Sequence, residues 1–301
     1  MFLRCLRDCV RMLSASDGVH IRPRSNLNRS RRGGSYRGKM TNRKISVASS
    51  KGGIGKTTVA LGIARALADA GHRVLLVDMD FGNACLDILT GVENEVLYTV
   101  ADIINGSCEP KEAVISLEQS GLYLLSAPAG GRESVTDKGA LCRAVNSAAE
   151  AVEASFTVLD TGAGVNVCAD AAFSVSDTVL VVAGHSPVSI RAAQSTAQRI
   201  ADTAYAEVKL VINAFDTGNI IKVRRGHRTG MLDIIDNSGI SLGGVVPYDY
   251  SLQLATEKAK CPRNEEAVCA FENIAARLCG ESVPLFSGMK KIRKKKKVLF
   301  S

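Results

Sequence analysis

A glycine-rich loop between an apolar stretch and a helical pattern constrains the fold of this chain more than any other feature. The loop reads Lys51-Gly-Gly-Ile-Gly-Lys-Thr-Thr58. The residues before it, Ile45 to Ser49, have the composition of a short buried strand, and residues 57–70 carry apolar side chains at helical spacing. A phosphate-binding loop requires this order of strand, loop and helix. The sequence therefore predicts a nucleotide-binding loop.

Each part of the loop has a predicted role. Its glycines let the backbone turn tightly and point N–H groups at phosphate oxygens, and the N-terminus of the following helix adds its dipole. We expect Lys56 to reach the β- and γ-phosphates and the Thr57 hydroxyl to bind Mg²⁺. The predicted nucleotide contacts in the loop are Gly52, Gly53, Ile54, Gly55, Lys56, Thr57 and Thr58.

Apolar runs alternate with helical patterns over residues 40–284. Strands are predicted at 45–49, 74–77, 122–126, 156–159, 178–183, 208–212 and 240–246. Helices are predicted at 57–70, 138–153, 165–174, 188–203, 229–237, 250–258 and 264–279. Strands that alternate with helices indicate an α/β fold, with a mainly parallel twisted sheet covered by helices on both faces.

Three aspartates follow apolar runs. Asp78 and Asp80 end the run that begins at residue 74, and Asp160 ends the run that begins at residue 156. Carboxylates at the carboxyl edge of a parallel sheet face the ligand crevice. Asp160 is therefore suited to holding Mg²⁺ through water.

The additional lysine, Lys51, narrows the choice of family. The loop sequence resembles the deviant Walker A motif of the MinD/ParA family of P-loop ATPases, which have a SIMIBI-type fold, and the resemblance extends from Met40 to about Phe286. It implies that the chain binds ATP and Mg²⁺, hydrolyses ATP and forms a homodimer when ATP is bound. In that dimer Lys51 would reach the nucleotide of the partner subunit, and Lys51, Lys56 and Asp80 would be the catalytic residues. Asp80 would position the attacking water, and Asp78 would lie near the metal.

The same resemblance implies an adenine pocket. Asn213 and Pro247 each follow an apolar run, at positions where this family recognises adenine. An asparagine side chain can offer one donor and one acceptor to the edge of the base. An asparagine or proline at such a position is, taken alone, more often a turn residue than a binding residue. The binding role is favoured because both residues are in register with the other motifs.

Several segments resemble the septum-site branch of the family, namely residues 78–91, 97–106, 122–128 and 242–249. Three departures stand out. Ala84-Cys85 replaces the usual Arg-Asn pair, Gly162 replaces a common proline, and Ser50 replaces a common glycine. These departures leave the prediction of ATP binding intact, but they weaken inferences about partner contacts and hydrolysis rate.

The charge is concentrated at the two ends of the chain. Residues 1–39 carry ten Lys and Arg against two acids, and residues 290–301 carry seven against none, so that the remaining body has a small excess of acids. A basic nucleic-acid-binding face on the body is therefore not expected, and no sequence-specific nucleic acid is predicted as a partner. Residues 1–39 have three interpretations. In the first, the start has been assigned too early and Met40 is the initiator; the other two interpretations are a targeting segment and a disordered arm.

The basic tail, residues 285–301, is a candidate for membrane binding, as in septum-site members of the family. Met289, Ile292, Leu299 and Phe300 can share one helical face, interrupted by Lys296. Each Lys or Arg contributes about 1 kcal/mol near an anionic surface. One such tail is marginal, whereas two tails held in a dimer bind far better. A solvated tail, or one that contacts DNA phosphates, is the alternative.

The expected function is an ATPase that cycles between the cytosol and the inner face of the inner membrane and helps to place the division septum. A septum-inhibitor protein and an ATPase-activating protein are the implied partners. The alternatives are a ParA-type partition ATPase, a flagellar-number or pole-positioning ATPase, and a metabolic enzyme or metal-cluster carrier. Lys51 and the lack of a Cys-x-x-Cys motif argue against the last of these. No apolar run approaches the roughly 18 residues that a membrane span needs.

Overall fold

The predicted strands all belong to one sheet. The computed structural model describes residues 42–81, 83–128, 137–164, 166–216, 230–252 and 266–289. Its strands are β1 (Arg43–Ala48), β2 (Val74–Met79), β3 (Val114–Ser116), β4 (Leu122–Leu125), β5 (Phe156–Thr161), β6 (Thr178–Ala183), β7 (Glu207–Phe215) and β8 (Leu242–Pro247). Its helices are α2 (Lys56–Asp69), α3 (Leu86–Thr90), α4 (Val100–Asn105), α5 (Lys138–Ala151), α6 (Val167–Val175), α7 (Pro187–Thr203), α9 (Met231–Ser238) and α11 (Glu266–Leu278).

The order of the strands places the glycine-rich loop at the middle of the sheet. That order is β3-β4-β2-β5-β1-β6-β7-β8, and all pairs are parallel except β3 with β4. The loop leaves the carboxyl end of β1, whose neighbours are β5 and β6. Since parallel strands end at the same edge, the carboxylates at the ends of β2 and β5 lie on the side of the loop. This topology confirms the predicted fold class.

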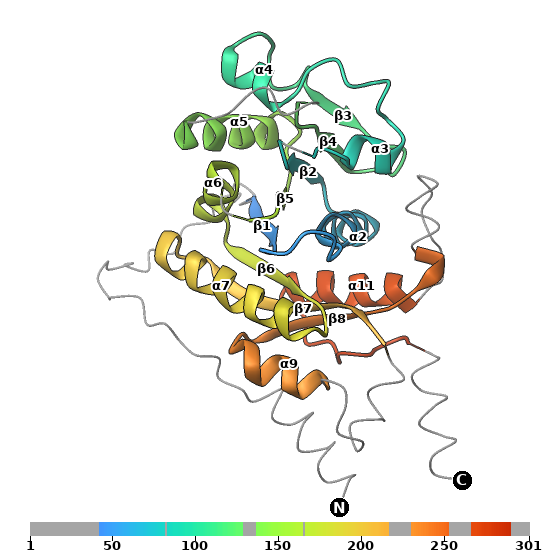
Figure 1. Cartoon of the computed structure of the whole chain (residues 1–301). Helices are drawn as coiled ribbons and strands as arrows, with labels where there is room; N and C mark the ends of the chain where they lie inside the picture. Colours follow the sequence, from blue (N-terminus) through green and yellow to red (C-terminus); the bar gives the residue numbers. More distant parts are fainter. Residues whose placement is uncertain are drawn as a thin grey trace, which may run out of the picture.

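Two layers of helices cover the sheet because alternate side chains of each strand point to opposite faces. In β2, Val74 and Leu76 pack in a cluster with α2 and α11, whereas Leu75 and Val77 pack in a second cluster with α5. Figure 1 shows α2 and α11 on one side of the sheet and α5, α6 and α7 on the other. The central strands β2, β5 and β6 are buried along their whole length, which explains why they read as nearly unbroken apolar runs.

Helix α11 approaches both α2 and β8 closely at two glycines. A Cβ atom on Gly62 of α2 would lie 2.5 Å from the ring of Phe271, and one on Gly244 of β8 would lie 2.3 Å from the side chain of Ile274. Phe271 and Ile274 are buried in the same cluster. The two glycines therefore provide the space in which α11 packs its apolar face.

Three short elements were not predicted from the sequence. They are the edge strand β3 and the helices α3 and α4, of three, five and six residues. Such lengths give too few residues for a periodic pattern. A signal for α4 does exist, because Thr99 and Asp102 have the spacing of a capping box, and the Asp102 carboxylate accepts the Thr99 N–H at 2.7 Å. The predicted helix 250–258 lies outside the described residues beyond residue 252.

The start of the basic tail differs from the prediction. Met289 was expected on a membrane-facing stripe, but its side chain is 1% exposed and packs in the core cluster that contains α11. The preceding turn is fixed on α11, where the Asn273 amide donates to the Ser287 carbonyl at 2.9 Å and Arg277 Nε donates to the Val283 carbonyl at 3.0 Å. Met289 is therefore a core residue in this structure, and the predicted stripe loses its first member.

Other predicted segments lie outside the described residues. These are residues 1–39 and the remaining candidate membrane contacts, Ile292, Leu299 and Phe300. Among the helices that the structure describes, none combines the length and apolar character required to cross a bilayer. The domain limits of 40 and 284 remain a prediction, although Phe286 also packs against the core.

The close contact at Gly62 generates a stability prediction. Gly62→Ala should lower the free energy of unfolding by about 1 to 2 kcal/mol, because forcing a methyl group against Phe271 costs about 1 to 3 kcal/mol and the gain in helix propensity offsets only about 1. Urea denaturation measures the difference. Phe271→Leu makes room, so the double variant should lose less stability than the two single losses added together. A Gly62→Ala chain as stable as the parent would show that α11 shifts freely.

Candidate nucleotide and metal site

The glycine-rich loop presents backbone donors at the start of α2. Gly53 and Gly55 have φ angles of +68° and +86°, a region that glycine enters without steric cost. Residues 51–53 are exposed, and Gly55 is the last residue before the helix. In the described chain no side chain caps the N-terminus of α2, and its first turn carries no acidic residue. The free N–H groups and the helix dipole therefore form an anion site.

Two polar contacts hold the loop in this shape. Asn213 donates its side-chain amide to the Ile54 carbonyl at 2.8 Å, and the Ser50 and Thr196 hydroxyls lie 2.5 Å apart. Asn213 comes from β7 and Thr196 from α7, so both contacts join the loop to elements beyond β1. Asn213 thus braces the loop in this structure. Its predicted contact with adenine remains a prediction, as does that of Pro247, which ends β8 and is buried.

A local irregularity in β7 lets Asn213 face the loop. The pairing of β7 with β8 shifts between Ile212 and Phe215, and Ala214 has a φ angle of +51°. A bulge of this kind turns side chains out of the regular alternation of a strand. The sequence singled out Asn213 because it follows an apolar run. The bulge in β7 accounts for the direction in which the Asn213 side chain points.

Asp78 is buried at the end of β2 and serves as a structural acceptor. Its carboxylate accepts backbone N–H groups from Asp80 at 2.9 Å, Cys85 at 3.0 Å and Leu86 at 3.2 Å. Burial raises the pKa of Asp78 to about 6, and the three N–H donors partly oppose that rise. The carboxylate therefore fixes the segment that leads into α3, which is a more specific role than the predicted position near a metal.

Asp160 has no such set of donors. It pairs with Asp78 in the register of β5 with β2, and it is 1% exposed. Its Oδ1 atom has no hydrogen-bond partner among the described residues. Burial raises the pKa of Asp160 to about 7, with Asp78 adding to the rise, whereas the Thr57 hydroxyl and the Lys56 charge oppose it. A buried carboxylate oxygen without a partner is costly, and a cation would remove that cost.

These residues fit a magnesium ion held together with phosphates. Asp160 Oδ1 and the Thr57 hydroxyl are oxygen donors beside the predicted phosphate site, and Mg²⁺ is usually held by one or two carboxylates, waters and substrate phosphates. The described residues contain no group of three or more His, Cys, Asp and Glu side chains that could hold a metal ion.

Asp80 lies at the rim of the same site, next to Gly162. A Cβ atom on Gly162 would lie 2.9 Å from Asp80 Oδ1 and 3.2 Å from Asn166 Nδ2. The glycine that departs from the family pattern therefore leaves room for the Asp80 carboxylate in this position. The role of Asp80 in positioning water remains a prediction.

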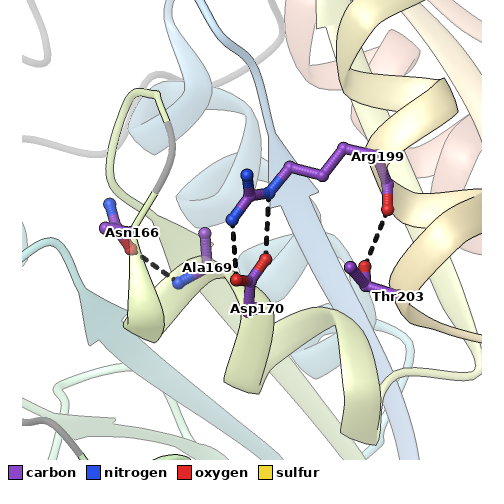
Figure 2. A network of polar contacts seen from close by, with 5 residues as sticks. All are labelled: Asn166, Ala169, Asp170, Arg199 and Thr203. Carbon is purple, nitrogen blue, oxygen red and sulfur yellow. Dashed lines mark hydrogen bonds and ion pairs between the residues drawn. The ribbon is translucent and has the colours of Figure 1, made fainter.

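The helix that follows β5 is held in place by polar contacts (Figure 2). Asn166 caps α6 by accepting the Ala169 N–H at 2.7 Å. Asp170 forms a two-pronged ion pair with Arg199 of α7, with Nε to Oδ1 at 2.9 Å and Nη2 to Oδ2 at 2.6 Å. Both side chains are about one quarter exposed, so the pair is partly shielded from water. This pair joins the Asp160 side of the site to the helix that braces the loop through Thr196.

Cys85 is a residue of this site that the sequence analysis did not single out as functional. It lies directly before α3, and its backbone N–H donates to Asp78 Oδ2 at 3.0 Å. Burial, followed by the charges of Asp78 and Asp160, raises the pKa of Cys85 to about 11. The available signal was the replacement of the usual Arg-Asn pair by Ala84-Cys85.

The structure brings most predicted site residues to one edge of the sheet. Thr57, Asp78 and Lys56 all lie near enough to Asp160 to affect its pKa, while Lys51 is exposed on the loop. An exposed Lys51 is compatible with a role toward another subunit, which stays a prediction.

The raised pKa of Asp160 generates a prediction about pH. The folded chain holds this proton more tightly than the unfolded chain, so the stabilisation from Asp160 is complete below about pH 4 and is lost as the pH rises toward 7. Without nucleotide or metal, Asp160→Asn should therefore reduce the change in unfolding free energy between pH 5.5 and pH 8 by about 2 kcal/mol. Urea titrations at both pH values measure it. Asp202→Asn, on the exposed side of α7, is the control, and equal pH dependence in both variants would contradict the prediction.

Comparison with known proteins gives the family. A family model described as an AAA domain matches residues 42–209. The septum site-determining protein MinD of Bacillus subtilis is 30% identical over 248 residues, which cover 80% of this chain and 90% of that protein. The structure of the MinC:MinD cell division protein complex of Aquifex aeolicus matches with a TM-score of 0.71 and 28% identity, covering 81% of this chain and 98% of that one.

A structure of MinD complexed with Mg-ADP, from Pyrococcus horikoshii, has the same fold. It matches with a TM-score of 0.69 and 23% identity, covering 79% of this chain and 96% of that one. The family model spans more than half of this chain, and the identity to the Bacillus protein extends over four fifths of it. The chain therefore belongs to the MinD/ParA family of P-loop ATPases.

Proposed function

We propose that this chain is an ATP-hydrolysing switch that acts in placement of the division septum. The observation that carries the proposal is the buried, unpaired Asp160 oxygen beside Thr57, at the uncapped N-terminus of α2. An anion site and a cation site lie side by side there, which is what a magnesium nucleotide requires. The likeness to MinD proteins favours septum placement over the other roles of the family.

In the proposed reaction the protein mainly positions charge. Lys56 and the loop N–H groups hold the β- and γ-phosphates, and Thr57 and Asp160 hold Mg²⁺. The bound ion would neutralise charge on the phosphate oxygens. Asp80, at the rim, orients the attacking water. Lys51 reaches the nucleotide of a second copy of the chain, so that hydrolysis is coupled to dimerisation.

We further propose that the dimer binds an anionic membrane through its paired tails and a septum-inhibitor protein through its body. The membrane proposal is supported by the seven Lys and Arg in residues 290–301. The inhibitor proposal is supported by the Aquifex structure, which is a MinC:MinD complex. ATP would join the subunits and hydrolysis would release them, which gives a cycle between the cytosol and the inner face of the membrane.

Substitutions in the loop test the chemistry. Lys56→Ala should abolish phosphate release, because the chain loses the positive charge that holds the β- and γ-phosphates. Asp80→Asn should retain nucleotide binding but hydrolyse about 100-fold more slowly. Phosphate release and calorimetric ATP binding are measured for each variant, with exposed Lys111→Ala as the control. Hydrolysis at the parental rate in Lys56→Ala would overturn the proposed ATPase activity.

Vesicle sedimentation tests the switch. The full chain should pellet with anionic vesicles in ATP but not in ADP, and replacing Leu299 and Phe300 by Glu should abolish pelleting. Tyr205→Glu, an exposed aromatic on the body, is the matched control. Failure to pellet at any lipid composition would overturn the membrane proposal, and ATP-dependent retention on DNA would then favour the partition alternative.

A further inference from the structure

Two serine hydroxyls hold the start of the glycine-rich loop, directly before Lys51. Ser49 is buried, and its hydroxyl accepts the Lys51 N–H at 3.1 Å and donates to the Lys51 carbonyl at 3.3 Å. Ser50 is exposed, and its hydroxyl lies 2.5 Å from the Thr196 hydroxyl of α7. The course of the backbone at Lys51 is therefore set by the two residues that precede it and by α7.

The direction of the bond between Ser50 and Thr196 follows from the number of hydroxyl protons. Thr196 has one such proton, and its hydroxyl donates to the Ala192 carbonyl, one turn earlier in α7, at 2.8 Å. The Thr196 oxygen is thus left as an acceptor, and Ser50 donates to it. Because Ser50 is exposed, its hydroxyl can bond to water when the Thr196 acceptor is removed. Removing that acceptor therefore frees the loop at a small cost to the fold.

Helix α7 gives the Thr196 oxygen a fixed position. Thr196 is 4% exposed, and Ala193 and Ile200 on the same helix are buried in a core cluster with strand residues. One turn beyond Thr196, Arg199 forms its two-pronged ion pair with Asp170 of α6 (Figure 2). A helix that is packed in the core and ion-paired with its neighbour has little freedom to move. The acceptor for Ser50 is therefore held in place relative to the sheet.

The phosphate-binding part of the loop has a separate contact. Asn213 donates to the Ile54 carbonyl at 2.8 Å, three residues after Lys51. This bond involves neither serine, so it persists when the bond between Ser50 and Thr196 is lost. The loss should thus disturb Lys51 more than the N–H groups that follow it. The exposed Lys51 side chain is a charge on a flexible stem, and its reach depends on the direction of the backbone that carries it.

We propose that Ser49, Ser50 and Thr196 are positioning residues that orient Lys51 toward the nucleotide of a second copy of the chain. Ser49 acts directly on the Lys51 backbone, and Thr196 acts through Ser50. The inference rests on the proposed function, in which Lys51 reaches that nucleotide, and it adds α7 to the elements on which the step depends. A misplacement of about 1 Å can slow a reaction on the order of 100-fold, so a single hydroxyl at the root of Lys51 matters.

The test removes the Thr196 acceptor while keeping the shape of the side chain. In the full chain, Thr196→Val should lower kcat for ATP hydrolysis about tenfold and weaken ATP-dependent dimerisation, measured by analytical ultracentrifugation. The calorimetric affinity for Mg-ADP should change less than about twofold, because Asn213 still holds Ile54. Ser50→Ala should behave in the same way, and combining it with Thr196→Val should add nothing. Thr196→Ser retains the acceptor and should keep the parental kcat.

Thr203→Val is the matched control. The Thr203 hydroxyl makes the same kind of bond as Thr196, to the Arg199 carbonyl one turn earlier at 2.8 Å, but it lies two turns further along α7 (Figure 2). This variant should keep the parental kcat, dimerisation and Mg-ADP affinity.

Limited trypsin digestion reports on Lys51 without any nucleotide. Trypsin cleaves after lysine, and a segment that opens more often is cut faster. Cleavage after Lys51, identified by mass spectrometry, should be at least about threefold faster in Thr196→Val than in the parent or in Thr203→Val. Failure of the proposed function is recognised separately. A parent chain that neither hydrolyses ATP nor dimerises would refute that function, while the digestion would still show whether the bond orders Lys51.

Three results would overturn the inference. Equal losses of kcat in Thr196→Val and Thr203→Val would indicate a general effect on α7. An Mg-ADP affinity that falls as far as kcat would place the contact in phosphate binding instead of in the orientation of Lys51. An unchanged rate of cleavage after Lys51 in Thr196→Val would show that the bond does not order that residue.

Discussion

Two carboxylates buried side by side constrain the rest of this structure. Asp78 and Asp160 are paired in the register of β2 with β5, and burial raises the pKa of both. Burying two like charges is unfavourable unless each finds donors or a cation. The chain provides donors to Asp78 from its own backbone, and it leaves Asp160 Oδ1 without one. The free energy that the fold gives up at Asp160 can be recovered when a metal ion binds.

The loop that faces this carboxylate is braced from one side of the sheet. Ser50 contacts Thr196 of α7, and Asn213 of β7 holds the Ile54 carbonyl. Helix α7 is in turn paired with α6 through Arg199 and Asp170. Contacts between separate elements of this kind reduce the freedom of a glycine-rich loop, which would otherwise have to be ordered by the ligand.

The position of Met289 changes how the tail would act. A core methionine fixes the start of the basic segment on α11 and cannot insert into a bilayer in this conformation. The contribution of apolar side chains to membrane binding by a single tail is then smaller than the sequence indicated. The contribution of its seven basic residues is unchanged. Membrane binding by such a tail depends more strongly on anionic lipid and on pairing of two tails.

The sequence by itself predicted the α/β fold, the phosphate loop and the places of the three aspartates, because each prediction rests on local order: apolar runs, a glycine pattern and acids at the ends of apolar runs. It did not indicate β3, α3 or α4, which are too short for periodicity. It also placed Met289 on a membrane-facing stripe, since spacing alone does not show what packs against a side chain. Only the tertiary structure decided that Asn213 braces the loop, and that Asp78 has backbone donors while Asp160 Oδ1 has no partner among the described residues. Both facts depend on contacts that the folded chain makes between separate elements, and a one-dimensional pattern holds no information about such distances.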